Sequence, residues 1–111
     1  MARHQITEYL DIDLDEERWV CRVCDHDIGE ARDNYKKGLL IRERDPREVH
    51  SSGLEEPRLH PDPEWCRIVE MFCPSCATLV EVEYLPPGHP LTYDIELDLD
   101  ALKARMADSA A

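Results

Sequence analysis

Four of the five cysteines of the chain occur in two pairs whose spacing suits metal binding. The pairs are Cys21-Arg-Val-Cys24 and Cys73-Pro-Ser-Cys76. Two residues between thiolates allow one tight turn, a knuckle, to direct both sulfurs at a single ion. Two knuckles then supply the four sulfurs of a tetrahedral site. The spacing therefore predicts one structural metal ion, with Cys21, Cys24, Cys73 and Cys76 as ligands and zinc as the first choice.

Iron in a rubredoxin-like centre is the main alternative to zinc, since the Cys-Pro-x-Cys form recurs in such centres. Rubredoxin knuckles normally carry Gly after the second cysteine, whereas Asp25 and Ala77 stand there in this chain. This departure counts against iron and leaves the geometry of both turns open. A thioredoxin-type redox pair is disfavoured, because neither pair opens a helix in a β-α-β unit. Buried free cysteines are a poor alternative explanation, because two independent Cys-x-x-Cys pairs rarely arise by chance.

Cys66 and His26 are the other residues that could touch the metal. Cys66 lies outside both pairs, and we expect it to be a small buried hydrophobic residue. His26 follows Cys24 by two positions, and we expect it to be solvated. A disulfide framework is not expected, because the cysteine count is odd and residues 1–6 lack the apolar segment of a signal peptide. We therefore expect a cytoplasmic protein.

A long insert must leave the first knuckle and return to the second. Residues 25–72 separate the pairs, against roughly 15–20 residues in a compact zinc finger. Alternating or short apolar runs predict strands at residues 6–14, 39–44, 65–72, 77–84 and 91–99, with a short extended piece at 18–20. The strands at 65–72 and 77–84 should form a hairpin with the metal at its tip, and Trp19 should be a core aromatic beside it.

The remaining segments are predicted to be less regular. Residues 28–37 favour a loop or a weak helical turn. Residues 45–64, with prolines at 46, 57, 61 and 63, favour a long irregular loop of the kind that often has a function. A short helix is expected in the C-terminal tail, residues 100–111, with Asp98 or Asp100 as its cap. The fold class is thus mainly β, as a single rubredoxin-like zinc-ribbon domain over residues 1–111 with a long insert, extra flanking strands and a short C-terminal helix.

The charge, the apolar runs and the motifs of the sequence exclude several classes of function. The chain has 25 acidic against 13 basic residues, a formal net charge of −12. Such a charge argues against binding to nucleic acid or to an anionic membrane, since both require clustered Lys and Arg. No apolar run approaches the 18 residues of a transmembrane helix. Phosphate-binding glycine loops, Gly-x-Ser-x-Gly and His-Glu-x-x-His are absent from the sequence, so we predict no catalytic residue in this chain.

The order of these features resembles a known family. An acidic N-terminal strand leads to Trp-Val-Cys-Arg-Val-Cys at residues 19–24, and a long insert then leads to the second cysteine pair. Residues 84–98 read Tyr-Leu-Pro-Pro-Gly-His-Pro-Leu-Thr-Tyr-Asp-Ile-Glu-Leu-Asp, which is the most specific part of the pattern. Over roughly residues 6–100, the chain is similar to the small gamma subunit of the acetone carboxylase and acetophenone carboxylase family.

The resemblance implies a role in an ATP-dependent ketone carboxylase, which adds bicarbonate-derived carbon to the methyl group of a ketone. Large hydantoinase- and oxoprolinase-like subunits would carry the ATP and bicarbonate chemistry. The small subunit would be a non-catalytic, zinc-binding accessory member of the hetero-oligomer. The short chain without further metal-binding clusters fits the acetophenone type better than the acetone type. We expect the 45–64 loop, with Leu54, Leu59 and Trp65, to contact the large subunits.

Two other functions remain open from the sequence. The same four cysteines could hold iron in an electron carrier. Alternatively, the chain could be a free-standing zinc-ribbon adaptor for another acidic–basic protein pair.

Overall fold

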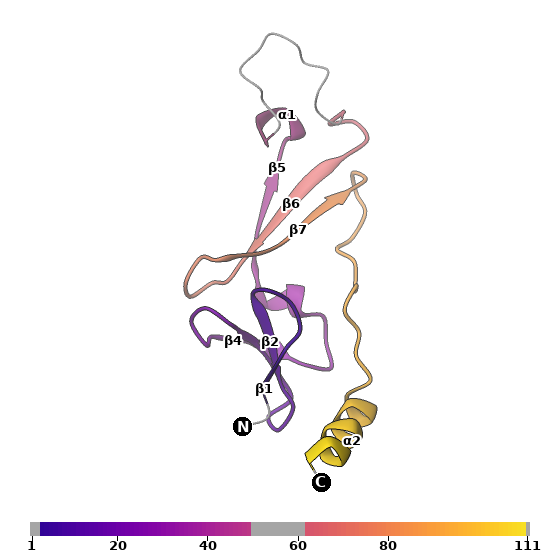
Figure 1. Cartoon of the computed structure of the whole chain (residues 1–111). Coiled ribbons are helices and arrows are strands. Elements are labelled where there is room, and N and C mark those ends of the chain that lie inside the picture. Colours follow the sequence, from indigo (N-terminus) through magenta and orange to yellow (C-terminus); the bar gives the residue numbers. More distant parts are fainter. Residues whose placement is uncertain (1–2, 50–61, 111) are drawn as a thin grey trace.

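A computed structural model describes residues 3–49 and 62–110 of the chain (Figure 1). Its strands form two antiparallel sheets. Sheet A contains, in spatial order, β1 (Arg3–Gln5), β2 (Leu10–Asp13), β3 (Arg18–Cys21) and β4 (Asp27–Glu30). Sheet B contains β5 (Leu40–Arg44), β6 (Arg67–Phe72) and β7 (Leu79–Leu85). The helical elements are the 3-10 helix η1 (Tyr35–Gly38), α1 (Pro46–Val49) and α2 (Leu99–Ala110).

The mainly β class is confirmed, with strands flanking the cysteine pairs and a short helix at the C-terminal end. The long insert between the pairs contributes β4, η1, β5, α1 and β6, and it therefore links the two sheets. Among the described residues, no helix is both long and apolar enough to cross a membrane.

Sheet A forms around β2, in which fully buried Leu10 and Ile12 alternate with acidic residues. Ile12 lies opposite Trp19 on β3, so the two side chains share the buried face. The single strand predicted at residues 6–14 is wrong. The amides of Ile6 and Thr7 both donate to the carbonyl oxygen of Leu10, at 2.9 and 3.0 Å, and this turn sends β1 back along β2.

Of the loop or weak helical turn predicted at residues 28–37, the helical turn is confirmed by η1, whereas the strand β4 was not predicted. Ile28 is the one buried residue of β4. A Cβ atom at Gly38 would lie 1.7 Å from the carbonyl oxygen of Ile28, so only glycine permits this approach of η1 to β4. Both elements are thus held close to the core of sheet A.

Sheet B is built on β6, its central strand, whose Val69 and Met71 are fully buried. The predicted strands at 39–44, 65–72 and 77–84 correspond to β5, β6 and β7. The hairpin of β6 and β7 is confirmed, and its connection carries Cys73 and Cys76. The predicted loop at 45–64 begins instead with α1, while residues 50–61, including Leu54 and Leu59, lie outside the described residues.

Residues 86–98, here named the strap, run from β7 past both sheets to α2 (Figure 1). The strand predicted at 91–99 is wrong, because residues 91–98 make no strand pairing. Within the alternating apolar set, Leu91, Ile95 and Leu97 pack against the core, whereas Tyr93 is exposed. The predicted cap of the C-terminal helix is confirmed: Asp98 Oδ1 accepts a hydrogen bond from the amide of Ala101 at 3.1 Å.

Candidate metal centre

The structure brings the four paired cysteines together. Their sulfurs, from Cys21, Cys24, Cys73 and Cys76, all lie within 4.8 Å of one another. Cys21 is at the end of β3 and Cys73 directly follows β6, so the cluster lies where the two sheets meet. Cys21 and Cys73 are fully buried, whereas Cys24 and Cys76 are half-buried. The cluster is therefore enclosed by protein on one side and near solvent on the other.

The two knuckles have the same backbone hydrogen bonds. In the first, the amide of Asp25 donates to the carbonyl oxygen of Cys21, and the amide of Cys21 donates to that of His26, at 2.9 and 3.0 Å. In the second, the amide of Ala77 donates to the carbonyl oxygen of Cys73, and the amide of Cys73 donates to the carbonyl oxygen of Thr78, both at 2.9 Å. Each knuckle is thus closed by hydrogen bonds within six consecutive residues.

The residues after the second cysteine of each pair adopt the left-handed conformation that glycine usually provides. The φ angles of Asp25 and Ala77 are 65° and 62°. The missing glycines therefore do not change the turn, which resolves the geometry that the sequence left open.

The sulfur spacing fits a tetrahedral ion. The distances Cys21 Sγ–Cys76 Sγ and Cys24 Sγ–Cys73 Sγ are both 3.7 Å. Four sulfurs at roughly 2.3 Å from a central zinc would lie about 3.8 Å apart. All four positions would be taken by protein sulfur, so this candidate metal site would be closed to water and substrate. Iron bound by four thiolates needs a similar arrangement, so the spacing indicates a metal without identifying it.

The thiols differ in how easily they lose a proton. Burial raises the pKa of Cys21 to about 12 and also raises the pKa of Cys73. Hydrogen bonding from the Thr78 hydroxyl, 3.0 Å away, and from the Thr78 amide lowers the pKa of Cys76 to about 6. Binding of a metal to all four sulfurs must therefore displace protons from the two buried thiols.

Neither Cys66 nor His26 belongs to the sulfur cluster. Cys66 precedes β6, whereas Cys73 follows it, so the two cysteines lie at opposite ends of that strand. Cys66 is half-buried, and its thiol donates to the carbonyl oxygen of Arg67 at 3.7 Å. The prediction of a core aromatic near the cysteines is confirmed: Trp19 is fully buried and contacts Tyr35 edge to face, with ring centroids 5.7 Å apart.

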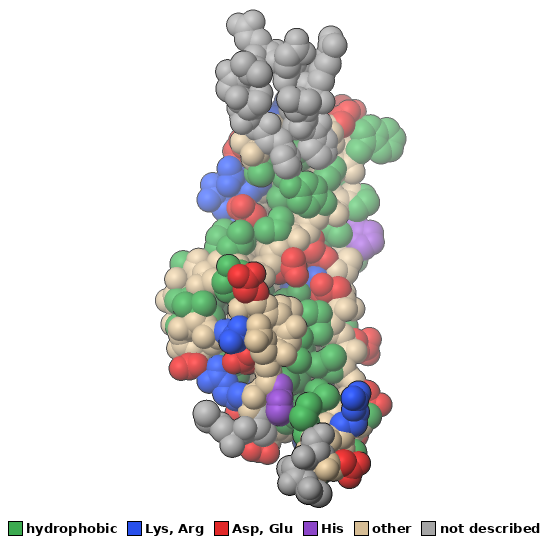
Figure 2. Space-filling view, in the orientation of Figure 1, with side chains coloured by type: hydrophobic (Ala, Val, Ile, Leu, Met, Phe, Trp, Pro, Cys, Tyr) green, Lys and Arg blue, Asp and Glu red, His purple; other side chains and the backbone are tan. Residues whose placement is uncertain are grey.

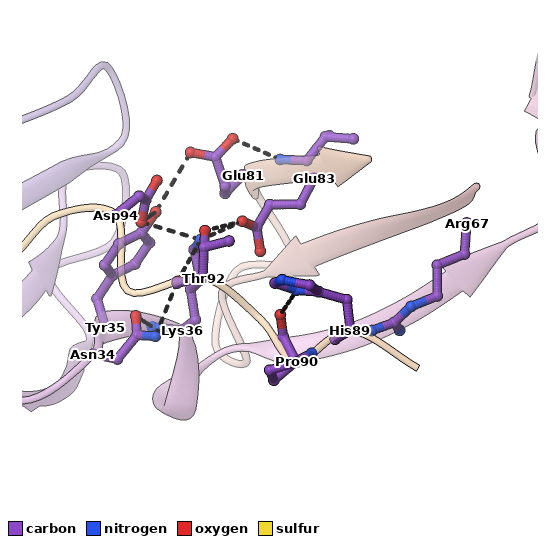
Figure 3. Close-up of polar contacts among 11 residues, drawn as sticks. Asn34, Tyr35, Lys36, Arg67, Glu81, Glu83, His89, Pro90, Thr92 and Asp94 are labelled. Carbon is purple, nitrogen blue, oxygen red and sulfur yellow. Dashed lines mark hydrogen bonds and ion pairs between the residues drawn. The ribbon is translucent and has the colours of Figure 1, made fainter. Parts of the chain in front are cut away.

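A second polar cluster, which the sequence did not predict, surrounds Lys36 of η1 (Figure 3). Lys36 is fully buried. Its ammonium lies 2.9 Å from a carboxylate oxygen of Glu83 on β7 and 3.1 Å from one of Asp94 on the strap. It also donates to the carbonyl oxygen and hydroxyl of Thr92, at 2.9 and 3.0 Å. The Thr92 hydroxyl in turn donates to Glu83.

This Lys36 cluster ties three segments that are distant in the sequence. The amide side chain of Asn34 also donates to Thr92, and the Tyr35 hydroxyl lies 3.4 Å from both Glu81 and Asp94. Burial, together with these two carboxylates, raises the pKa of Tyr35 and keeps its phenol neutral. Because Lys is mostly exposed in proteins, nothing in the sequence marked Lys36 as different from its neighbour Lys37.

Comparison with known proteins identifies the family. The model of the family described as acetone carboxylase gamma subunit matches residues 4–107. The chain belongs to this family. It is 51% identical over 105 residues to the acetophenone carboxylase beta subunit of Aromatoleum aromaticum, covering 94% of this chain and 81% of that protein. It is 37% identical over 87 residues to the acetone carboxylase gamma subunit of Xanthobacter autotrophicus, covering 75% of this chain and 49% of that protein.

The family match extends across both knuckles, the Lys36 cluster and the strap. This acetone carboxylase gamma subunit family is the one that the cysteine pairs and the 84–98 segment indicated. The candidate metal site and residues 84–98 therefore lie within one matched region.

Proposed function

We propose that the chain is a non-catalytic, structural zinc-binding subunit of an ATP-dependent ketone carboxylase. It forms a single domain and binds one zinc ion through Cys21, Cys24, Cys73 and Cys76. Large hydantoinase- and oxoprolinase-like subunits use the ATP and the bicarbonate, and the hetero-oligomer is cytoplasmic. Membership in the acetone carboxylase gamma subunit family supports the complex. The observation that carries the structural role is the set of four sulfurs spaced for a closed tetrahedral site.

A closed site favours a structural over a catalytic metal. With four protein sulfurs as ligands, no position remains at which the metal could activate water or polarise a carbonyl group. The cysteines come from the end of β3 and from the β6–β7 connection. A bound ion would therefore join sheet A to sheet B, which is a structural task.

The substrate proposed is a methyl ketone, aryl rather than alkyl. The support is the higher identity to the acetophenone carboxylase beta subunit, 51%, than to the acetone carboxylase gamma subunit, 37%. The ketone would bind in the large subunits, because this chain supplies no predicted catalytic residue.

Purification of the tagged chain from its source tests the proposal. We expect large subunits to accompany it, one zinc per chain, and ketone-dependent ATP hydrolysis by the complex but not by the isolated chain. Cys73→Ser should abolish zinc binding, whereas the matched Cys66→Ser should retain it, because Cys66 lies at the far end of β6.

Three results would contradict this function. Iron in place of zinc, with a red colour, would favour an electron carrier. Absence of any large subunit would favour a free-standing adaptor. Ketone-dependent ATP hydrolysis by the isolated chain would refute the non-catalytic role.

A further inference from the structure

Sheet B presents one face that is turned away from the core cluster, and of the residues on this face Ile68 is itself buried. The register of β5, β6 and β7 places nine side chains on this outer face in three rows. The rows are Leu40–Phe72–Leu79, Arg42–Glu70–Val82 and Arg44–Ile68–Tyr84. Val69 and Met71 point to the opposite side, where both are fully buried in the core.

Exposed large apolar side chains concentrate in sheet B and in the segments next to its strands, and three of them lie on the outer face. Eight large apolar side chains are exposed among the described residues, and six belong to sheet B or to the segments next to its strands, while none belongs to a strand of sheet A. On the outer face itself, Leu40 is 57% exposed, Tyr84 49% and Leu79 38%. Figure 2 shows hydrophobic side chains at the surface over this sheet. Single exposed hydrophobic residues are ordinary, but a contiguous row across a sheet indicates an interaction site.

Arg42 supplies the polar feature of this face. It is exposed in the middle row, next to the apolar row that begins with Leu40. Every other described Lys or Arg except Arg105 lies within 4.0 Å of a carboxylate of this chain. The carboxylate opposite Arg42, Glu70, lies 3.5 Å from Arg44 instead. In a chain of net charge −12, an arginine that has no carboxylate partner among the described residues and lies beside an apolar row leaves a position for a carboxylate from another protein.

A second copy of this chain fits the face poorly. β5 is an edge strand, and four of its five residues are exposed. Twofold antiparallel pairing of two β5 strands about their central residue would place Arg42 opposite Arg42, and like charges directly opposite destabilise a sheet. Each copy would also bring a net charge of −12. The charges therefore favour a different protein as the partner.

We propose that the outer face of sheet B is the surface by which this chain docks on a large carboxylase subunit. Leu40, Phe72 and Leu79 meet an apolar patch of that subunit, and Arg42 pairs with one of its carboxylates. The proposal rests on the proposed function, and it adds the surface and the chemistry of the partner. It differs from the expectation that the 45–64 loop makes the main contact.

Binding of the zinc-loaded chain to the purified large subunits tests this surface. Arg42→Glu and Leu40→Ser should each weaken binding by more than about tenfold, as central interface residues do. The matched controls are Arg105→Glu, another exposed arginine without a carboxylate partner among the described residues, and Tyr93→Ser in the strap, whose side chain is 39% exposed. Both controls should bind within about twofold of the wild type. Zinc content and circular dichroism verify that each variant is folded.

Hydrogen exchange gives a readout without substitution. The amides of β5 should exchange more slowly in the complex than in the free chain, whereas those of β3, which is central in sheet A, should not change. Unchanged exchange in β5, or wild-type binding by both Arg42→Glu and Leu40→Ser, would overturn the proposal while leaving the proposed function intact. Loss of binding only on deletion of residues 51–60 would assign docking to the loop. If the wild-type chain binds no large subunit, both the surface and the function are wrong.

Discussion

At the scale of single residues, the knuckles depend on two positions in a conformation that L-amino acids usually avoid. The left-handed region costs most residues roughly 1–2 kcal/mol, with Asn and Asp affected least. Asp25 belongs to the tolerant class, whereas Ala77, with φ of 62°, does not. Two backbone hydrogen bonds hold Ala77 in this conformation. Its amide donates to the carbonyl oxygen of Cys73, and the amide of Cys73 donates to the carbonyl oxygen of Thr78.

Ala77→Gly should therefore stabilise the zinc-loaded protein. Glycine relieves the steric cost but adds chain entropy in the unfolded state, and the balance favours folding by about 0.5–1 kcal/mol. Chemical unfolding of the zinc-loaded protein measures the change. The control is Ala104→Gly on an exposed position of α2, which should destabilise by about 0.5–1 kcal/mol. A lower stability of Ala77→Gly would show that this turn does not require a left-handed residue.

The candidate site was largely predictable from residue spacing, because a Cys-x-x-Cys pair is a local signal. The Lys36 cluster was not, because its partners Glu83 and Asp94 are far away in the sequence and look like ordinary surface carboxylates of alternating segments. A buried ion pair leaves no periodic signature, so only the three-dimensional arrangement reveals it.

At the scale of elements, α2 is attached to sheet A through Glu17, in the turn between β2 and β3. Glu17 lies 2.6 Å from the Lys103 ammonium of α2 and 2.5 Å from the Arg32 guanidinium. Arg32 also contacts Asp100 at 2.9 Å. Hydrogen bonds from Arg32, which contributes most, and from Lys103 lower the pKa of Glu17 to about 2. These contacts are partly exposed, so salt and solvent limit their strength.

Attachment of α2 should consequently weaken in acid. A carboxyl group whose pKa is lowered by folding stabilises the folded state above its unfolded pKa of about 4.5, and this contribution is lost as the pH falls toward about 2. Amide hydrogen exchange in α2 should therefore accelerate below about pH 5 relative to the Glu17→Gln variant. Glu16→Gln, at the neighbouring exposed position, is the control and should retain the wild-type pH dependence. Identical profiles for wild type and Glu17→Gln would show that this ion pair does not hold α2.

The two incorrect strand predictions have one physical cause. Period-two alternation reports which side chains are buried, and it does not report which backbone groups pair. In the strap, Leu91, Ile95 and Leu97 reach the core from an unpaired extended chain. Residues 6–14 alternate through a turn, since Ile6 also packs on the core. In β6 burial and pairing coincide, whereas β5 pairs with β6 although four of its five residues are exposed.

At the scale of the whole molecule, two polar centres connect the halves. The sulfur cluster joins β3 to the β6–β7 connection, and the Lys36 cluster joins η1 to β7 and the strap. The first consists of four cysteines that could hold a metal ion, whereas the second is held by hydrogen bonds and ion pairs between protein groups. The buried apolar core that includes Trp19, Tyr35 and Met71 lies in both sheets and completes the connection.

Replacing Lys36 with methionine should destabilise the zinc-loaded protein strongly. The apolar side chain would leave the carboxylate of Glu83, which is 11% exposed, without its cation. Removing one member of a buried pair typically costs 3–5 kcal/mol, and the partial exposure of Asp94 favours the lower value, about 3 kcal/mol. Urea unfolding measures the loss. Lys37→Met removes an exposed pair with Asp33 and should change stability by less than about 1 kcal/mol. Equal stabilities of the two variants would refute a structural role for the Lys36 cluster.

The local folding of each knuckle has a consequence for how the length of the chain can vary. Backbone hydrogen bonds within residues 21–26 and 73–78 close the two knuckles, so a longer connection between β5 and β6 leaves both turns unchanged. The entropy of closing such a loop grows with the logarithm of its length. Thirty extra residues in the insert of residues 25–72 would therefore raise the closure cost by only about 0.4 kcal/mol. Insertions between β5 and β6 can thus lengthen the chain while the four sulfurs keep their positions.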